Sequence, residues 1–263
     1  MFKFCSLYSG STGNSLFVQS DSTKILIDAG ESCKKIEEGL SNINVDADDL
    51  DAILVTHEHS DHIKGLGTLS KKHNIPVYAN NGTWNSMNDQ KNKICSENIK
   101  IFNTNESFKI GNFIISPFSI PHDATDPCGF NICNGNTKIS IATDLGHVTD
   151  DIIYHLKQSD FILLESNYDS EILKCSSYPY SLKRRIAGPI GHLSNDMAGK
   201  LISYLMQYGL KSAMLGHLSK ENNFPELAYK TVVEQLIENN YEADSIQLSV
   251  AKRCTQTPLI DVG

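Results

Sequence analysis

The segment LVTHEHSDHIKG at residues 54–65 constrains the fold more than any other stretch of the chain. It places His57, His59, Asp61 and His62 within six residues, so four side chains that can bind metal are close together. On a helix, residues two apart point about 200° from each other, and His57 and His59 could not bind one ion. On an extended segment leaving a strand, both face the same side. The segment therefore predicts a strand ending near residue 56, followed by a loop in which Asp61 and His62 can face a second ion.

The chemistry of these ligands indicates which metals the loop would bind. Histidine and aspartate suit Zn²⁺, and the same set could take Mn²⁺ or Fe. The metalloprotease motif HExxH is excluded because residue 61 is Asp. The alternative is a polar surface loop, but three histidines and an aspartate at this spacing rarely occur without a metal.

Length, charge and cysteine usage restrict the class of protein. The 263 residues contain no Pro-rich or Ser/Gly-rich linker, which predicts a single domain over residues 1–263. The net charge of −8 disfavours a protein that coats nucleic acid by charge alone, but not an enzyme that acts on nucleic acid at a metal site. Seven irregularly spaced cysteines without a CxxC pair predict a reduced, cytoplasmic location. No stretch approaches the ~18 apolar residues of a membrane span, so no membrane association is expected.

The hydrophobic pattern predicts an α/β fold. Short runs rich in β-branched residues, such as KILIDAG, AILVTH and KISIATD, predict strands. Helical periodicity predicts helices over residues 62–73, 148–157, 195–208 and 225–239. Hairpins followed by strand–helix alternation in each half of the chain predict two sheets with helices outside them.

Four further polar residues lie at or just beyond the ends of predicted strands, namely Asp28, His122, Asp144 and His217. Each of them alone could be a polar residue that is satisfied locally. Active sites of α/β proteins gather at such positions, and the four residues together with the 57–62 cluster favour a metal site.

The tetrapeptide GHLS occurs twice and places two histidines in different settings. His192 precedes a predicted helix, whereas His217 ends a predicted strand. The two histidines are therefore expected to have different roles.

The HxHxDH motif that follows a strand resembles the metallo-β-lactamase superfamily, whose other motifs occur here in order over nearly the whole chain. Asp28 in ILIDAG matches an early Asp that supports the histidine loop. The resemblance implies an αββα four-layer sandwich with two divalent metal ions. It implies His57, His59 and His122 on one ion, Asp61, His62 and His217 on the other, and Asp144 between them.

Four segments resemble the YycJ/WalJ-like branch, whose members are regarded as metal-dependent nucleases linked to DNA repair. They are YSGSTGNS at 8–15, PHDATDPCGF at 121–130, GHLSND and LGHLSKENN. They are also similar to the RNase Z branch, in which a histidine opening a helix binds the scissile phosphate and donates a proton, steered by a glutamate. His192 and Glu165 match that pair. The chain departs from these relatives in having no inserted arm that grips tRNA and no β-CASP domain. The resemblance implies catalytic roles for Asp61, His192 and Glu165.

Residues expected to bind substrate follow from the same segments. The helix after His192 offers positive dipole and backbone N–H groups to a phosphate, although Ser194 or Asn195 could simply cap it. In the 8–15 loop, Gly10 and Gly13 allow backbone amides to face an anion, and Ser11 and Asn14 are the residues expected to bind substrate there, but a plain hairpin loop fits equally. The basic run Lys183, Arg184 and Arg185 could hold a nucleic-acid backbone or be a solvated surface.

The predicted function is a metal-dependent phosphodiesterase or nuclease, 5′–3′ exonuclease-like on DNA, that uses a water activated by two metals. Alternatives are hydrolysis of a small phosphodiester or thioester, or a non-catalytic metal-bound regulatory protein. The predicted partner is nucleic acid, with DNA ahead of RNA, and the sequence leaves open whether the chain forms a homodimer.

Overall fold

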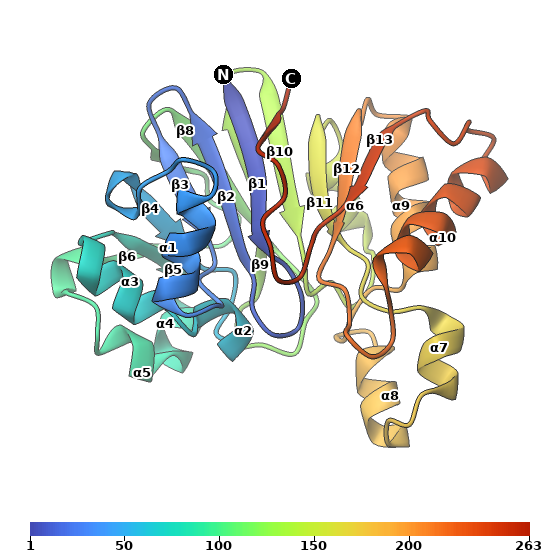
Figure 1. Ribbon diagram of the computed structural model, residues 1–263, viewed down its shortest axis with the longest axis horizontal. Helices are drawn as coiled ribbons and strands as arrows, with labels where there is room; N and C mark the ends of the chain where they lie inside the picture. Colours follow the sequence, from blue (N-terminus) through green and yellow to red (C-terminus); the bar gives the residue numbers. More distant parts are fainter. The chain divides into compact units, whose positions relative to one another are not determined.

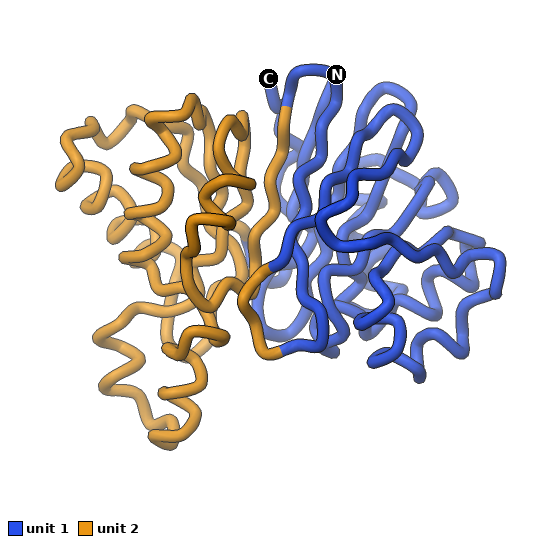
Figure 2. Tube along the Cα trace, turned by 180° about the vertical axis from the view of Figure 1, so that it is seen from behind, with its two compact units in different colours: residues 1–119, 124–137, 252–263 blue, residues 120–123, 138–251 orange.

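The computed structural model describes residues 1–263, and its strands belong to two mixed sheets with helices beside them (Figure 1). This confirms the α/β class. The chain divides into two compact units, which Figure 2 draws in different colours. Residues 1–119, 124–137 and 252–263 form unit 1, and residues 120–123 and 138–251 form unit 2. The single domain over residues 1–263 stays a prediction.

Unit 1 contains a seven-stranded sheet with the strand order β14-β1-β2-β3-β4-β5-β6. Its first strands pair antiparallel as a meander, and the strands from β3 to β6 are parallel. Because β14 pairs with β1, the two chain termini lie side by side (Figure 1). The strands are β1 Phe2–Tyr8, β2 Ser15–Ser20, β3 Lys24–Ile27, β4 Ala52–Leu54, β5 Val77–Asn80, β6 Ile99–Phe102 and β14 Ile260–Asp261.

Helices α1 and α3 cover one face of this sheet and share its hydrophobic core (Figure 1). Ile36 and Leu40 of α1 are fully buried there, as are Leu66 and Leu69 of α3. The helices and 3₁₀ turns of unit 1 are α1 Cys33–Ser41, η1 Ala47–Asp49, α2 Ser60–Ile63, α3 Leu66–His73, α4 Asn81–Ser86, α5 Asn88–Lys91 and η2 Ser96–Asn98.

The prediction of one helix over residues 62–73 is wrong, because the chain forms α2 and then α3, with a break at Lys64 and Gly65. A Cβ atom on Gly65 would lie 2.2 Å from the carbonyl oxygen of Glu31, so the backbone there packs against a distant segment. The break therefore comes from a tertiary contact that helical periodicity does not reveal.

Unit 1 also contains the antiparallel strands β7 Phe108–Ile110, β8 Phe113–Ser119 and β9 Cys128–Asn134. Aromatic rings join them to the seven-stranded sheet. Phe108 stacks on Tyr78 with ring centroids 5.5 Å apart, and Phe130 meets Phe102 edge-on at 5.8 Å. These ring contacts hold the two sets of strands together within the unit.

Unit 2 is built on four parallel strands, β10 to β13, with helices in the connections. The predicted helices at 148–157, 195–208 and 225–239 are present with ends shifted by one or two residues. The elements are β10 Thr137–Ala142, α6 Asp150–Leu156, β11 Phe161–Glu165, α7 Ser170–Cys175, α8 Tyr180–Ile186, α9 Asn195–Met206, β12 Ser212–Gly216, α10 Pro225–Glu238 and β13 Gln247–Val250. Helices α9 and α10 lie side by side next to β12 and β13, and α7 and α8 extend away from the sheet (Figure 1).

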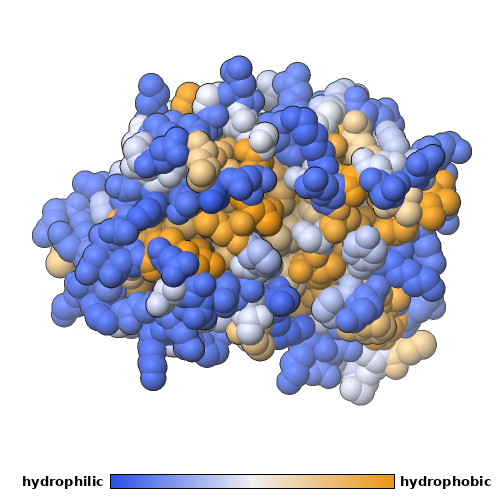
Figure 3. Space-filling model, turned by 45° about the horizontal axis from the view of Figure 1, so that its top comes forward, coloured by the Kyte–Doolittle hydropathy of each residue, from blue (hydrophilic) through white to orange (hydrophobic).

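The surface is mainly polar. On the face drawn in Figure 3, hydrophilic residues predominate and hydrophobic residues form patches between them, as on most folded proteins. None of the helices combines the length and the apolar character that crossing a membrane requires.

Candidate functional site

Most of the candidate site residues follow the carboxyl ends of strands. Asp28 directly follows β3, Asp144 lies two residues beyond the end of β10, and His217 directly follows β12. These three residues adopt left-handed backbone conformations, with φ of 62°, 57° and 55°. Such conformations are strained for residues other than glycine and cluster at functional sites. The backbone thus turns sharply at each strand end and directs a polar side chain away from the sheet.

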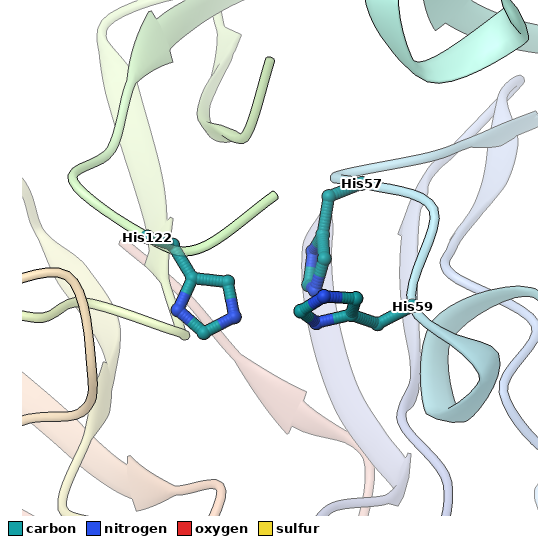
Figure 4. A group of neighbouring side chains, drawn as sticks. All are labelled: His57, His59 and His122. Atoms are coloured by element: carbon teal, nitrogen blue, oxygen red, sulfur yellow. The ribbon is translucent and has the colours of Figure 1, made fainter. Parts of the chain in front are cut away.

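In unit 1, the segment after β4 brings three imidazoles together. His57 lies three residues beyond the end of β4, and His59 has extended backbone angles just before α2. The ring centroids of His57 and His59 are 4.7 Å apart, and those of His57 and His62 are 4.1 Å apart. Figure 4 draws His57 and His59 with their rings close to each other. The extended segment therefore places the histidines two apart on one side, as the spacing requires.

Asp28 fixes the orientation of this loop. Its Oδ1 accepts a 2.9 Å hydrogen bond from the backbone N–H of Thr56, and its Oδ2 accepts one of 2.8 Å from the Thr56 hydroxyl. Oδ2 also lies 2.7 Å from Nδ1 of His62, and the carboxylate is 2% exposed. Because a carboxylate only accepts, His62 donates from Nδ1 and carries its lone pair on Nε2. This carboxylate–histidine pair is the arrangement that orients metal-binding histidines.

The Gly-rich loop at 8–15 packs against the same segment through Asn14. The Asn14 Oδ1 accepts from the backbone N–H of Gly10, and its Nδ2 lies 3.1 Å from Nε2 of His62. Its backbone N–H donates to the carbonyl oxygen of Asp61 at 2.8 Å. Asn14 is 4% exposed, whereas Ser11 is exposed in the turn. Asn14 thus positions the histidine loop, and substrate contact by Ser11 and Asn14 stays a prediction.

In unit 2, one buried carboxylate joins both GHLS histidines. Glu165 is fully buried, and its Oε1 lies 2.9 Å from Nδ1 of His192 and 2.7 Å from Nδ1 of His217. Its Oε2 accepts backbone N–H bonds from Leu145 at 2.6 Å and Leu193 at 3.1 Å. Ligand atoms of His192, His217, Glu165 and Asp144 all lie within 4.8 Å of one another. The two histidines therefore share a carboxylate but differ in exposure, with side chains 20% and 2% exposed.

The charges in this cluster favour a protonated His192. Burial lowers the pKa of His192, but the charge of Glu165 and its hydrogen bond raise it more, so the pKa lies above its ordinary value. Burial likewise raises the pKa of Glu165, but the charge of His192 and the bonds from both histidines outweigh it, and the pKa is lowered. An ionised Glu165 and an imidazolium at His192 are the states that these interactions favour.

The surroundings of His122 favour a neutral imidazole, in contrast to those of His192. Its Nδ1 lies 3.0 Å from the carbonyl oxygen of Gly191, and its Nε2 lies 3.6 Å from Oδ1 of Asp144. Burial lowers the pKa of His122 despite the charge of Asp144. A neutral imidazole that donates from Nδ1 presents Nε2 as an acceptor, which is the form that binds a metal.

The donor chemistry fits divalent metal ions. In His62, His122 and His217, a carboxylate or carbonyl oxygen accepts from Nδ1, which orients the ring so that Nε2 is the nitrogen that would coordinate a metal. Buried carboxylates, Asp144 among them, accompany these imidazoles. Nitrogen and oxygen donors of this kind suit Zn²⁺ and Mn²⁺. The structure therefore supports the use of divalent metal, while the number of ions and their identity stay predictions.

The basic run lies on α8 and is partly engaged within unit 2. Arg185 donates from Nε to Oδ2 of Asp123 at 2.6 Å, and Lys183 donates to the carbonyl oxygen of Lys174. Arg184 lies 6.0 Å from the centre of the Tyr180 ring. A cavity of about 390 Å³ lies against this face, lined by Tyr168, Ser170, Leu173, Lys174, Tyr180, Lys183, Arg184 and Ala187.

Sequence reasoning missed two features of the site. Thr56 was not expected to take part, although it directly precedes His57 and its hydroxyl lies 3.0 Å from Nδ1 of that ring. Glu165 was expected to steer His192 only, and its bond to His217 was not foreseen. The repeated GHLS motif was the signal that could have linked both histidines to one partner.

Comparisons with known proteins agree with this geometry. The Beta-lactamase superfamily domain matches residues 23–218. Exodeoxyribonuclease WalJ of Streptococcus pneumoniae is 41% identical over 237 residues, covering 89% of this chain and 88% of that protein. Exodeoxyribonuclease YycJ of Bacillus anthracis is 40% identical over 238 residues, covering 90% of each. The chain belongs to the metallo-β-lactamase superfamily. Within it, the chain is a YycJ/WalJ-like protein, as its motifs predicted.

Solved structures of the superfamily support its fold. YhfI from Bacillus subtilis, a metallo-β-lactamase fold protein, has a TM-score of 0.70 at 17% identity and covers 98% of this chain and 99% of its own. The short form of human tRNase Z has a TM-score of 0.68 at 17% identity and covers 99% of both chains. At this identity the likeness concerns the fold alone, and it confirms the predicted sandwich of the metallo-β-lactamase type.

Proposed function

We propose that this member of the superfamily is a metal-dependent exodeoxyribonuclease that hydrolyses phosphodiester bonds from the 5′ end of DNA. The observation that carries the proposal is the buried Glu165 carboxylate, which holds His192 beside His217 and the acidic Asp144. This pairing suits a group that must give a proton to a departing alkoxide. The identity of about 40% to two proteins named exodeoxyribonucleases, over nine tenths of the chain, supports DNA as the substrate.

The proposed metal ligands come from both halves of the chain. His57, His59 and His122 would bind one ion, Asp61, His62 and His217 the other, and Asp144 both. Bound divalent ions would lower the pKa of an attacking water and offset charge on the phosphoryl oxygens. Asp28 and Glu165 would orient His62 and His217 through their Nδ1 atoms, so that each ring directs Nε2 to a metal.

His192 is the proposed general acid. Its side chain reaches solvent while Nδ1 stays bonded to Glu165, so Nε2–H is the proton available to the leaving oxygen. His192 also lies three residues before α9, whose first-turn N–H groups favour a phosphate nearby. Asp61, which is partly exposed, would orient the attacking water in addition to binding metal.

The proposed path of the DNA strand crosses α8. Lys183 and Arg184 would contact phosphates, and Tyr180, which is 76% exposed, offers an aromatic face for a base. Arg185 is paired with Asp123, so its proposed role is to hold the loop that carries His122 as well as to bind substrate. DNA repair, a cytoplasmic location and homodimer formation stay predictions.

The proposal is tested with end-labelled, 5′-phosphorylated single- and double-stranded DNA and RNA in Mn²⁺. The wild type should shorten DNA stepwise from the 5′ end, and Asp61→Ala should be inactive. Asp21→Ala, which removes an acid that is 77% exposed on the β2–β3 hairpin, is the matched control and should be fully active. A metal-loaded wild type that cleaves no polymer, but hydrolyses a small phosphodiester or a thioester, would contradict the proposal.

A further inference from the structure

A second cluster of metal-binding side chains lies in unit 1 and shares no residue with the proposed catalytic site. Cys33 and Glu37 lie on α1, and His73 is the last residue of α3. One ligand atom from each of these three residues lies within 4.8 Å of the other two. Thiolate, imidazole and carboxylate are together the donor types of zinc sites.

The two helices are arranged so that the donors converge. Cys33 and Glu37 are four residues apart and therefore share one face of α1. The Oε1 atom of Glu37 lies 3.3 Å from Sγ of Cys33 and 2.7 Å from Nε2 of His73. A single carboxylate oxygen thus lies between the thiol of one helix and the imidazole of the other.

Asp48 of η1 orients the imidazole from its other side. The Asp48 carboxylate accepts a hydrogen bond from Nδ1 of His73, and Nε2 donates to Oε1 of Glu37, so the ring bridges two carboxylates. A carboxylate that accepts from Nδ1 orients a metal-binding histidine, and Nε2 of His73 would become a ligand once it has lost its proton. Asp28 makes the same contact with Nδ1 of His62 in the proposed catalytic site.

Access to the cluster is open. A cavity of about 430 Å³ adjoins it, and both Glu37 and His73 line that cavity. Lys72 donates to the same Oε1 of Glu37 at 2.7 Å, but its side chain is 58% exposed and can turn into solvent. Lys72 is therefore a cation that a metal ion bound to Glu37 could displace.

We propose that Cys33, Glu37 and His73 bind a zinc ion that joins α1 to α3, with a water molecule as the fourth ligand. Binding releases to solvent the thiol proton of Cys33 and the Nε2 proton that His73 donates to Glu37, and it displaces the ammonium group of Lys72 from Glu37. Because thiol and imidazole must lose protons before they bind a metal, the affinity should increase with pH. The inference is independent of the proposed nuclease function.

Co²⁺ as a probe separates this site from the catalytic one, because a thiolate ligand gives a near-ultraviolet charge-transfer band and the proposed catalytic ligands include no cysteine. The full-length protein titrated with Co²⁺ should develop this band. Cys33→Ser should lose it, whereas Cys254→Ser, which changes an exposed cysteine, should keep it. A band that is absent from the wild type at saturating Co²⁺, or that persists in Cys33→Ser, would overturn the proposal.

Two further variants distinguish a metal site from a network of ion pairs. Asp48→Asn should weaken Co²⁺ binding at the thiolate site roughly 10–100-fold. Lys72→Ala should strengthen it severalfold, because it removes the competing cation. If Lys72→Ala instead weakens or abolishes the band while circular dichroism shows native secondary structure, Lys72 is part of the binding arrangement and the proposed site is wrong.

Discussion

Replacement of His192 by alanine should slow DNA hydrolysis without removing metal. General acid catalysis contributes about 10²–10⁴-fold, which corresponds to a barrier increase of about 2.7–5.4 kcal/mol. The fold should tolerate the change because Glu165 keeps three of its four hydrogen-bond donors, those from His217, Leu145 and Leu193. His217→Ala is the matched variant, because His217 is the histidine of the second GHLS motif and donates to the same Oε1 atom of Glu165. It should lose metal as well as activity.

The leaving group provides the decisive assay for His192. In DNA the leaving group is a strongly basic sugar alkoxide that needs a proton. In the p-nitrophenyl ester of a nucleotide the leaving group is p-nitrophenolate, which departs without one. The kcat of His192→Ala should therefore fall far less on the p-nitrophenyl ester than on DNA, with metal content measured by mass spectrometry in both preparations. An equal loss on the two substrates, or full activity on DNA with metal bound, would refute the role of His192 as proton donor.

Three other substitutions probe the surroundings of the site. Asp28→Asn removes the charge that orients His62 and should weaken metal binding roughly 10–100-fold in a metal titration. Gly30→Ala would place a Cβ atom 1.7 Å from the carbonyl oxygen of Asp61, and should reduce the free energy of unfolding in urea by about 1–3 kcal/mol or more. Burial raises the pKa of Asp126, although a hydrogen bond with Thr104 lowers it. The ionised form of Asp126 therefore destabilises the fold as the pH rises past the ordinary pKa of 3.8. Asp126→Asn should thus be more stable than wild type at pH 7, and an unchanged denaturation midpoint would contradict this.

The sequence predicted the strand-end positions of the site well because local pattern determines them. Alternation of apolar residues marked the strands, and Asp28, Asp144 and His217 lie one or two residues past the strand ends. The spacing of His57 and His59 required an extended segment, and the structure has one. Helix α9 was also predictable, since its periodicity and the cap at Ser194 are local.

Other features depend on contacts between distant segments and left no local signal. Asn14 contacts His62, which lies 48 residues further along the chain. Its contact with the histidine loop could therefore not be inferred from the Gly-rich segment around it. The break between α2 and α3 arises from the packing of Gly65 against Glu31. Helix α8 was not predicted, because it has no buried residues and hence no apolar periodicity.

Metal dependence is the central claim, and chelation tests it most directly. Protein stripped of metal should fail to hydrolyse 5′-phosphorylated DNA, and addition of Mn²⁺ or Zn²⁺ should restore activity as the chain takes up two catalytic ions. Stripped protein that still hydrolyses DNA at the wild-type rate, with no ion detected by mass spectrometry, would contradict the account.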